Sequence, residues 1–165
     1  MNFNTLPKFC ISLKGSPRRA HMQQQLEKFN ITNVNFFDAI DKKTLVVPEL
    51  STKLNKGDGI ENVAGVLACM KSHVKLIALA KQMGIKEMVV FEDDIIFCDD
   101  FWDRISYIEG LDLDYDIFSL GGHFDRPERP MIPNEDYAKK TNHEYIYRTF
   151  HKGGTYCYII KSTVY

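Results

Sequence analysis

The chain has 165 residues, of which 44% are hydrophobic and 26% charged, and its formal net charge is −1. This length suits one domain with a sizeable core, and the composition is that of a soluble globular protein. No lysine- and arginine-rich tract alternates with aromatic residues, which argues against a nucleic-acid-binding surface. The first residues lack the pattern of a secretory signal, and no apolar run approaches the ~20 residues of a membrane span.

The four cysteines are far apart, and none belongs to a Cys-x-x-Cys pair: Cys10, Cys69, Cys98 and Cys157. Each lies in an apolar segment, where a cysteine usually behaves as a small buried hydrophobic residue. We therefore expect a reducing compartment and no zinc site.

The first forty residues predict a strand, a helix and a second strand. Residues 9–13 form a short apolar run, and Ser16 before Pro17 is a typical helix start, with the serine as N-cap. The helix continues to about Phe29, and residues 34–40 have the pattern of the next strand. Strand, helix and strand within ~40 residues indicate a βαβ unit with parallel strands.

Three basic residues, Lys14, Arg18 and Arg19, cluster between the end of the first strand and the first turn of the helix. A helix N-terminus favours anions, and added cations suit a diphosphate. A solvated basic turn with no ligand explains the same pattern, and the residues alone do not decide between the two.

The middle of the chain predicts a long helix after a polar excursion. Residues 42–61 have the length and composition of a functional lid. A helix over 62–83 then has an apolar stripe, which we expect to comprise Val63, Leu67, Met70, Val74, Ile77, Leu79 and Ala80.

The remaining chain continues the alternation of strands and helices. Asp99 or Asp100 suits the cap of a short helix over 101–108. Gly121 and Gly122 follow a strand and permit close approach of the backbone to a ligand. Residues 125–136 contain three prolines and form an irregular excursion. The strands expected in this part cover residues 116–120, 145–150 and 156–160.

The most informative stretch is the apolar run 88–91, which leads directly into Glu92, Asp93 and Asp94. Such a run predicts a strand buried on both faces, with the acids emerging at its carboxyl end, where ligands bind in open α/β sheets. Side chains alternate along a strand, so Glu92 and Asp94 share one face. Their oxygen atoms suit Mg²⁺ or Mn²⁺ held with a ligand's phosphates. The alternative is an acidic strand exit in which Asp93 or Asp94 caps a local turn.

Five stretches taken together resemble glycosyltransferase family 25, which contains bacterial lipopolysaccharide and lipooligosaccharide sugar transferases and collagen galactosyltransferase-like enzymes. The most specific is VFEDD, which is similar to the family's L-E-D-D motif. The sequence departs from the family pattern with Ser12 for asparagine, Lys42 for glycine, Val66 for an acid and Ala68 for glycine. The five stretches are ISLKGSPRR (11–19), FFDAID (36–41), GVLACMKSH (65–73), VFEDD (90–94) and GGTYCYIIKS (153–162).

This resemblance implies an α/β fold of the GT-A type, a single Rossmann-like domain over residues 1–165 with a mostly parallel central sheet flanked by helices. The C-terminal part usual in the family is expected to be missing. The implied activity is metal-dependent, inverting transfer of a hexose, galactose or glucose, from a UDP-sugar to a glycan, lipooligosaccharide or hydroxylysine acceptor. We expect a cytoplasmic protein at the inner face of a membrane, with peripheral contact and no transmembrane segment.

The resemblance also implies roles for individual residues. Asp94 and then Glu92 are the expected ligands of Mn²⁺ or Mg²⁺, and Asp93 is expected to contact the donor. The nucleotide-sugar is expected to contact Leu13, Lys14, Arg18, Arg19, Ser72, His73, Asp93, Gly121 and Gly122. A histidine alone on a helix is more often a packed residue than a catalyst, so the assignments of Ser72 and His73 rest on the resemblance.

Several assignments stay open. An inverting transfer needs a general base, and His123, Asp125 and His151 are candidates among which the spacing does not choose. A catalytically silent nucleotide-sugar- or glycan-binding module, favoured by Val66 and Ala68, is the main alternative function. A metal-dependent phosphotransfer or phosphohydrolase domain is another, because one fold hosts many chemistries. The oligomeric state is open as well.

Overall fold

The computed structural model describes residues 1–46, 60–121, 138–144, 146–149 and 156–165, without the side chains of residues 60–62, 138 and 149. Its helices are α1 (Arg18–Lys28), α3 (Ile60–Gln82) and α4 (Phe101–Glu109), with short 3-10 turns at Lys42–Thr44 and Ser162–Val164. Its strands are β1 (Lys8–Ser12), β2 (Val34–Asp38), β3 (Glu87–Glu92), β4 (Ile117–Ser119), β5 (Ala138–Lys140), β6 (Tyr147–Thr149) and β7 (Cys157–Lys161). The predicted lid and proline-rich excursion lie largely outside the described residues.

A five-stranded sheet in the order β2-β1-β3-β7-β4 forms the centre of the molecule. β1 pairs in parallel with both β2 and β3, whereas β7 runs antiparallel to its neighbours β3 and β4. Four of the five strands therefore point the same way, which confirms the predicted α/β class with a mostly parallel sheet. β5 and β6 form a separate antiparallel pair, of which β5 was not predicted.

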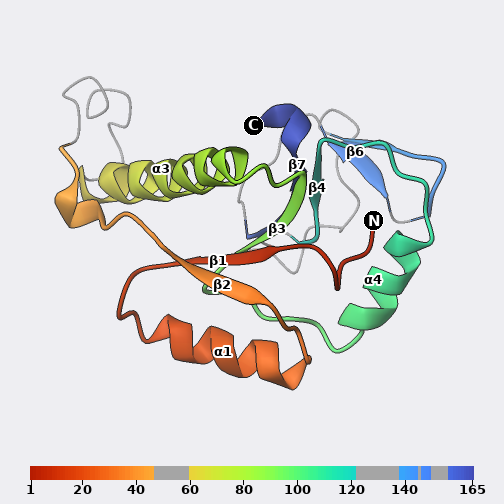
Figure 1. Ribbon diagram of the computed structural model, residues 1–165, viewed down its shortest axis with the longest axis horizontal. Helices are drawn as coiled ribbons and strands as arrows, with labels where there is room; N and C mark the ends of the chain where they lie inside the picture. The colour runs from red at the N-terminus through yellow and green to blue at the C-terminus, as the bar shows by residue number, and fades with distance from the viewer. Residues whose placement is uncertain (47–59, 122–137, 145, 150–155) are drawn as a thin grey trace.

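Helices cover both faces of this sheet. α1 and α4 pack on one face, where Met22, Leu26 and Phe101 join side chains of β3 and β7 in one buried cluster. α3 packs on the other face through Leu76 and Ala80. Figure 1 shows α1 and α3 on opposite sides of the crossing strands β1 and β2. The central strand β3 is buried on both faces, as its apolar run predicts.

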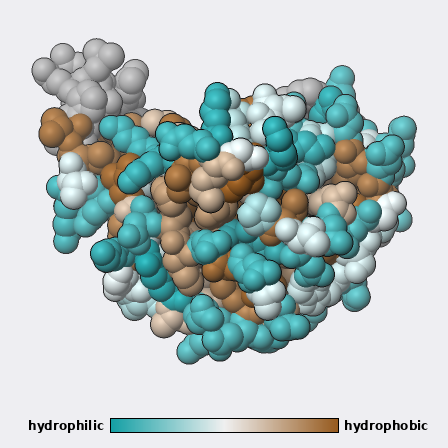
Figure 2. Space-filling model, in the orientation of Figure 1, coloured by the Kyte–Doolittle hydropathy of each residue, from teal (hydrophilic) through white to brown (hydrophobic). Residues whose placement is uncertain are grey.

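The edge strand β2 is less covered than the strands beside it. Val34, Phe36 and Phe37 are all partly exposed. In Figure 2, apolar residues gather near the middle of the visible face, between the positions that α3 and α1 take in Figure 1, and polar residues surround them. The sheet is therefore well buried at its centre and open along this edge.

The predicted apolar stripe of α3 is wrong in part. Met70, Val74 and Leu79 are 52%, 60% and 36% exposed, whereas Val63 and Ala80 are buried as predicted and Leu76, which the stripe left out, is fully buried. The side of the helix that faces the sheet carries Leu76 and Ala80, and the small residues Ala64, Ala68 and Ser72 are buried as well. By length and composition alone, Val63–Gln82 of this helix could cross a membrane, contrary to our expectation that no run approaches that size. In this fold, however, one side of this segment is buried against the sheet, as in the core helices of globular proteins.

The start of α1 also differs from prediction by one residue. The helix begins at Arg18, with Pro17 in the N-cap position rather than the first helical position. Ser16 still acts locally as predicted, because its Oγ accepts a hydrogen bond from Arg18 N at 3.2 Å. Gly15 has φ +74°, a conformation that glycine adopts without strain, in the turn between β1 and α1. This turn brings the first residues of α1 to the carboxyl end of the sheet.

Candidate functional site

The carboxyl ends of three parallel strands meet at one edge of the sheet. Ser12, Asp38 and Glu92 are the last residues of β1, β2 and β3, and the registers place Ser12 opposite Asp38 and Ile11 opposite Glu92. Ligands bind at this edge in open α/β sheets. Asp93 and Asp94 follow immediately in the chain, so the three acids expected to hold the cation and the donor lie at this edge.

Asp93 is held in place from inside the sheet. The hydroxyl of the buried Ser12 donates a hydrogen bond of 2.6 Å to Asp93 Oδ2. Arg18 Nη1 lies 3.4 Å from Asp93 Oδ1 and 3.2 Å from Asp94 Oδ2. The Asp93 side chain is 13% exposed and that of Asp94 43%. Asp93 is thus oriented by the protein, and Asp94 presents its carboxylate to solvent.

The two arginines of α1 have different positions. Arg18 faces the acids, whereas Arg19 Nη2 donates hydrogen bonds to the carbonyl of Ser12, at 2.8 Å, and to Asp38 Oδ1. The hydrogen bond from Arg19 lowers the pKa of Asp38. Arg19 therefore links the carboxyl ends of β1 and β2. The other predicted residues of this turn, Leu13 and Lys14, are exposed beside it.

Ser72 and His73 are brought to the same edge by α3. Ser72 Oγ accepts a hydrogen bond from Ile40 N at 2.9 Å and donates one to Ala68 O at 2.6 Å. Ser72 is buried, and its contacts connect α3 to the segment after β2. The structure gives Ser72 this connecting role, and contact with a nucleotide stays a prediction.

His73 lies between a strand-end carboxylate and a buried phenol. Its Nε2 is 3.2 Å from Glu92 Oε1, and its Nδ1 is 2.8 Å from the hydroxyl of Tyr158 in β7. Burial acts to lower the pKa of His73, but hydrogen bonding with Cys69 and Glu92 outweighs it and raises the pKa to about 9. Both ring nitrogens then carry protons, donated to Glu92 and Tyr158.

Glu92, Asp93 and Asp94 do not point to the faces that strand alternation predicts for them. Asp93 and Asp94 share Arg18 as a partner, while Glu92 faces His73. The reason is that β3 ends at Glu92 and the next two residues form a turn, so the period of two no longer applies beyond that residue. The expected common face for Glu92 and Asp94 was wrong.

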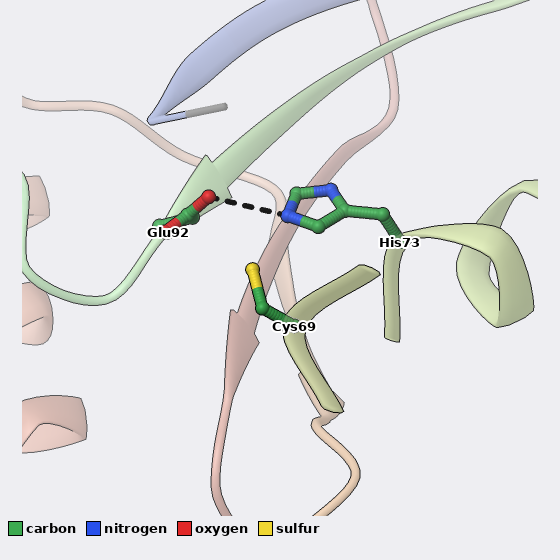
Figure 3. Close-up of side chains that lie close together, drawn as sticks. All are labelled: Cys69, His73 and Glu92. Carbon is green, nitrogen blue, oxygen red and sulfur yellow. Dashed lines mark hydrogen bonds and ion pairs between the residues drawn. The ribbon is translucent and has the colours of Figure 1, made fainter. Parts of the chain in front are cut away.

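Cys69 joins His73 and Glu92 in a cluster that the sequence analysis missed (Figure 3). One ligand atom from each of the three lies within 4.8 Å of the others. The spacing of Cys69 and His73, four residues apart on a predicted helix, is the sequence signal that could have indicated this cluster.

Cys69 and Cys98 are exposed, contrary to expectation, whereas Cys10 and Cys157 are buried as expected. Burial raises the pKa of Cys10 to about 12.

Part of the predicted site lies outside the described residues. Gly122 and the three candidate bases, His123, Asp125 and His151, belong to that part. Gly121 is described and exposed just after β4, and its carbonyl accepts a hydrogen bond from Ser119 Oγ at 2.9 Å.

The family model described as glycosyltransferase family 25 (LPS biosynthesis protein) matches residues 5–164. The chain belongs to glycosyltransferase family 25. This membership confirms the resemblance carried by the five sequence stretches, and the mixed sheet with its parallel core is consistent with a GT-A-like fold.

Two curated relatives are 32% identical to this family 25 chain over an alignment 136 positions long, and the match covers 74% of the chain. They are the probable inactive glycosyltransferase 25 family member 3 of Rattus norvegicus and the inactive glycosyltransferase 25 family member 3 of Mus musculus. The aligned residues make up 24% and 23% of those proteins. The chain therefore spans about a quarter of the length of these relatives.

The contact between His73 and Glu92 predicts that stability depends on pH. The pKa of His73 is about 9 in the folded state and about 6.5 in an unfolded chain. The folded state binds more protons between these values, so the stabilisation is full below pH ~6.5 and is lost as the pH rises to about 9. We expect a decrease on the order of 1–3 kcal/mol in the free energy of unfolding, measured by urea denaturation with EDTA present.

His73→Gln should remove most of this decrease, since glutamine stays neutral over the range. His21→Gln provides the matched control, because His21 is exposed on α1, and it should keep the pH dependence of the unmodified chain. The same pH dependence in the His73→Gln variant as in the unmodified chain would contradict the assignment.

Proposed function

We propose that this chain binds a UDP-sugar together with a divalent cation and transfers the hexose, galactose or glucose, with inversion. Family membership supports glycosyl transfer as the chemistry. The observation that carries the proposal is the position of Asp93 and Asp94 at the carboxyl edge of β3, with Arg18 against both carboxylates. A diphosphate and its cation need both signs of charge at one place.

The residues at this edge fit a hard cation. Both Asp93 and Asp94 offer carboxylate oxygens, which Mg²⁺ and Mn²⁺ prefer. A positive group, the Arg18 guanidinium, already lies within 3.4 Å of one oxygen of each, so the position attracts cations. The exposed carboxylate of Asp94 would hold the ion, and Asp93 would be oriented by Ser12. Glu92 was the second expected ligand, but its contact with His73 makes it a weaker candidate.

The protein groups would act on the diphosphate by charge and orientation. When bound, the cation would supply neutralisation of the charge that develops on the leaving UDP. Arg18, which is exposed, would exchange its carboxylate contacts for the phosphates as the ligand arrives. Arg19 and Ser12 would keep the strand ends and Asp93 fixed, so that no reorganisation is needed during transfer.

A silent nucleotide-sugar-binding module is the second candidate function. It is favoured by the names of the two relatives, which describe those proteins as inactive or probably inactive. The same site would then bind the donor without turnover.

The acceptor of an active chain would be a glycan, a lipooligosaccharide or hydroxylysine. The first two agree with the family's description as an LPS biosynthesis protein.

A thermal-shift series tests the proposed donor and cation together. We expect UDP-galactose or UDP-glucose to raise the melting temperature in the presence of Mn²⁺ and to have little effect in EDTA, because a ligand of the native state stabilises it. At a ligand concentration of 100 Kd the gain is about 2.7 kcal/mol, or roughly 5–11 °C for a chain of this size. A GDP-sugar is the control for the nucleotide.

Turnover then separates the candidate functions. Release of UDP over hours, with or without an acceptor, supports the transferase, whereas UDP-sugar binding without release supports the silent module. Release of inorganic phosphate would identify a phosphohydrolase. An equal melting temperature with and without every UDP-sugar and Mn²⁺ would contradict the proposed ligand.

A further inference from the structure

We propose that Cys69, His73 and Glu92 form a binding site for a zinc-class transition-metal ion, distinct from the cation site at Asp93 and Asp94. The proposal goes beyond the sugar-transfer function and does not depend on it. It rests on the geometry of three side chains from two elements, on the partner of the histidine ring and on the kinds of donor atom.

The geometry of the cluster suits one ion. Cys69 and His73 are four residues apart on α3, so their side chains lie on the same face of the helix. Glu92, the last residue of β3, points toward them (Figure 3). His73 Nε2 and Glu92 Oε1 are 3.2 Å apart, close to the ~3.3 Å that two ligands at 2.0–2.1 Å from a tetrahedral zinc ion have between them. Cys69 Sγ is within 4.8 Å of a ring nitrogen of His73 and of a carboxylate oxygen of Glu92.

The second nitrogen of His73 already has the partner that a metal-binding histidine needs. Nδ1 lies 2.8 Å from the hydroxyl of Tyr158, which is buried in β7. Such an outer partner fixes the ring and leaves Nε2 for the metal. The strand end that carries Glu92 is fixed as well, because the Glu92 backbone N–H donates to the carbonyl of Tyr156 at 2.8 Å. The histidine ring is therefore oriented before an ion arrives, and the backbone of Glu92 is held in place.

The donor atoms select the kind of ion. Sulfur, imidazole nitrogen and carboxylate oxygen together favour Zn²⁺, and Co²⁺ as its substitute, over Mg²⁺ or Mn²⁺. Asp93 and Asp94 offer oxygen only, so the two neighbouring sites differ in preference. On binding, the ion replaces the proton on His73 Nε2 and the proton on the Cys69 thiol, and both leave to solvent.

The ion can also reach the cluster. Cys69 is exposed on α3, whereas His73 is buried and Glu92 is partly buried. Three protein ligands leave the fourth tetrahedral position for water, as in zinc sites that keep an open position. The expectation of no zinc site considered only paired cysteines, and this set uses one cysteine with ligands from two other residue types.

Cobalt titration of the metal-free full chain tests the site. We expect one Co²⁺ per chain, with the near-ultraviolet absorption of a thiolate bound to cobalt, and displacement of Co²⁺ by a stoichiometric amount of Zn²⁺. Cys69→Ser should abolish the thiolate absorption and weaken binding by about 100-fold or more. Cys98→Ser is the matched control, since Cys98 is likewise an exposed free cysteine, and it should behave like the unmodified chain.

Other outcomes overturn the proposal. Absence of the thiolate absorption in the unmodified chain, its persistence in Cys69→Ser, or its loss in Cys98→Ser would each exclude this site. Asp94→Asn should leave the cobalt absorption unchanged, whereas loss of the absorption in that variant would place the ion at the other acids. Because Cys69→Ser alters an exposed position, circular dichroism should show an unchanged fold. Failure of UDP-sugar binding, by contrast, would leave the cobalt result intact and would count only against the proposed function.

Discussion

Asp94→Asn is expected to lower the rate of UDP-sugar turnover by about 10²–10³-fold, the typical cost of removing one oriented electrostatic group from a reaction site. Asparagine keeps the shape of the side chain but loses the charge that would hold the cation. The Asp94 side chain is 43% exposed and contacts Arg18 at the surface, so the free energy of unfolding should change by less than about 1 kcal/mol. The measurement is UDP release at saturating Mn²⁺.

The matched control for this variant is Asp99→Asn. Asp99 is also an acid after β3 with a basic partner, Lys28, but its side chain is 95% exposed and it lies outside the proposed site. It should keep full turnover. If the unmodified chain binds a UDP-sugar without turnover, the same comparison is made on Mn²⁺-dependent UDP affinity. Undiminished turnover or affinity in Asp94→Asn would remove Asp94 from the cation site.

Phe101→Ala is expected to have the largest effect on stability, a loss of about 3–5 kcal/mol in the free energy of unfolding. The Phe101 ring is buried at the start of α4. Its centroid lies 4.9–6.1 Å from the rings of Phe3, Phe29, Phe97 and Trp102. Removing it leaves a cavity among rings that come from four parts of the chain, which cannot all move inward together. Urea denaturation measures the loss.

Ile96→Ala is the control for this substitution, because Ile96 is 77% exposed in the same region. It should change the free energy of unfolding by no more than about 0.5 kcal/mol. A loss below about 1 kcal/mol in Phe101→Ala would show that the aromatic cluster relaxes around the missing ring and does not determine stability.

Most elements of the described fold were predictable because their local signals agree. The run ending at Glu92 gave β3, the Ser16-Pro17 pair gave the start of α1 to within one residue, and the βαβ pattern gave the parallel pairing of β1 and β2. Each of these signals acts over a few residues of chain. β5 was missed because Ala138–Lys140 has no apolar alternation and pairs through its backbone with β6.

The orientation of α3 was not predictable from its own sequence. Its residues offer two apolar faces, one with Val66, Met70 and Val74 and the other with Ala68 and Leu76. The expected stripe included Met70 and Val74, which are exposed, and left out Leu76, which is fully buried against the sheet. Which face is buried depends on the surface that the helix meets, and that surface is built by β1, β3 and β7.

The sequence by itself determined the α/β class, the family and the position of the acids at the end of a strand. These follow from local patterns and from motifs that survive in order along the chain. Only the tertiary structure decided the partners: Asp93 with Ser12, Arg18 with two carboxylates, and Glu92 with His73 rather than with Asp94. The physical reason is that hydrogen bonds and charge pairs act within a few ångströms in space, and residues far apart in sequence come within that range only when the strands align.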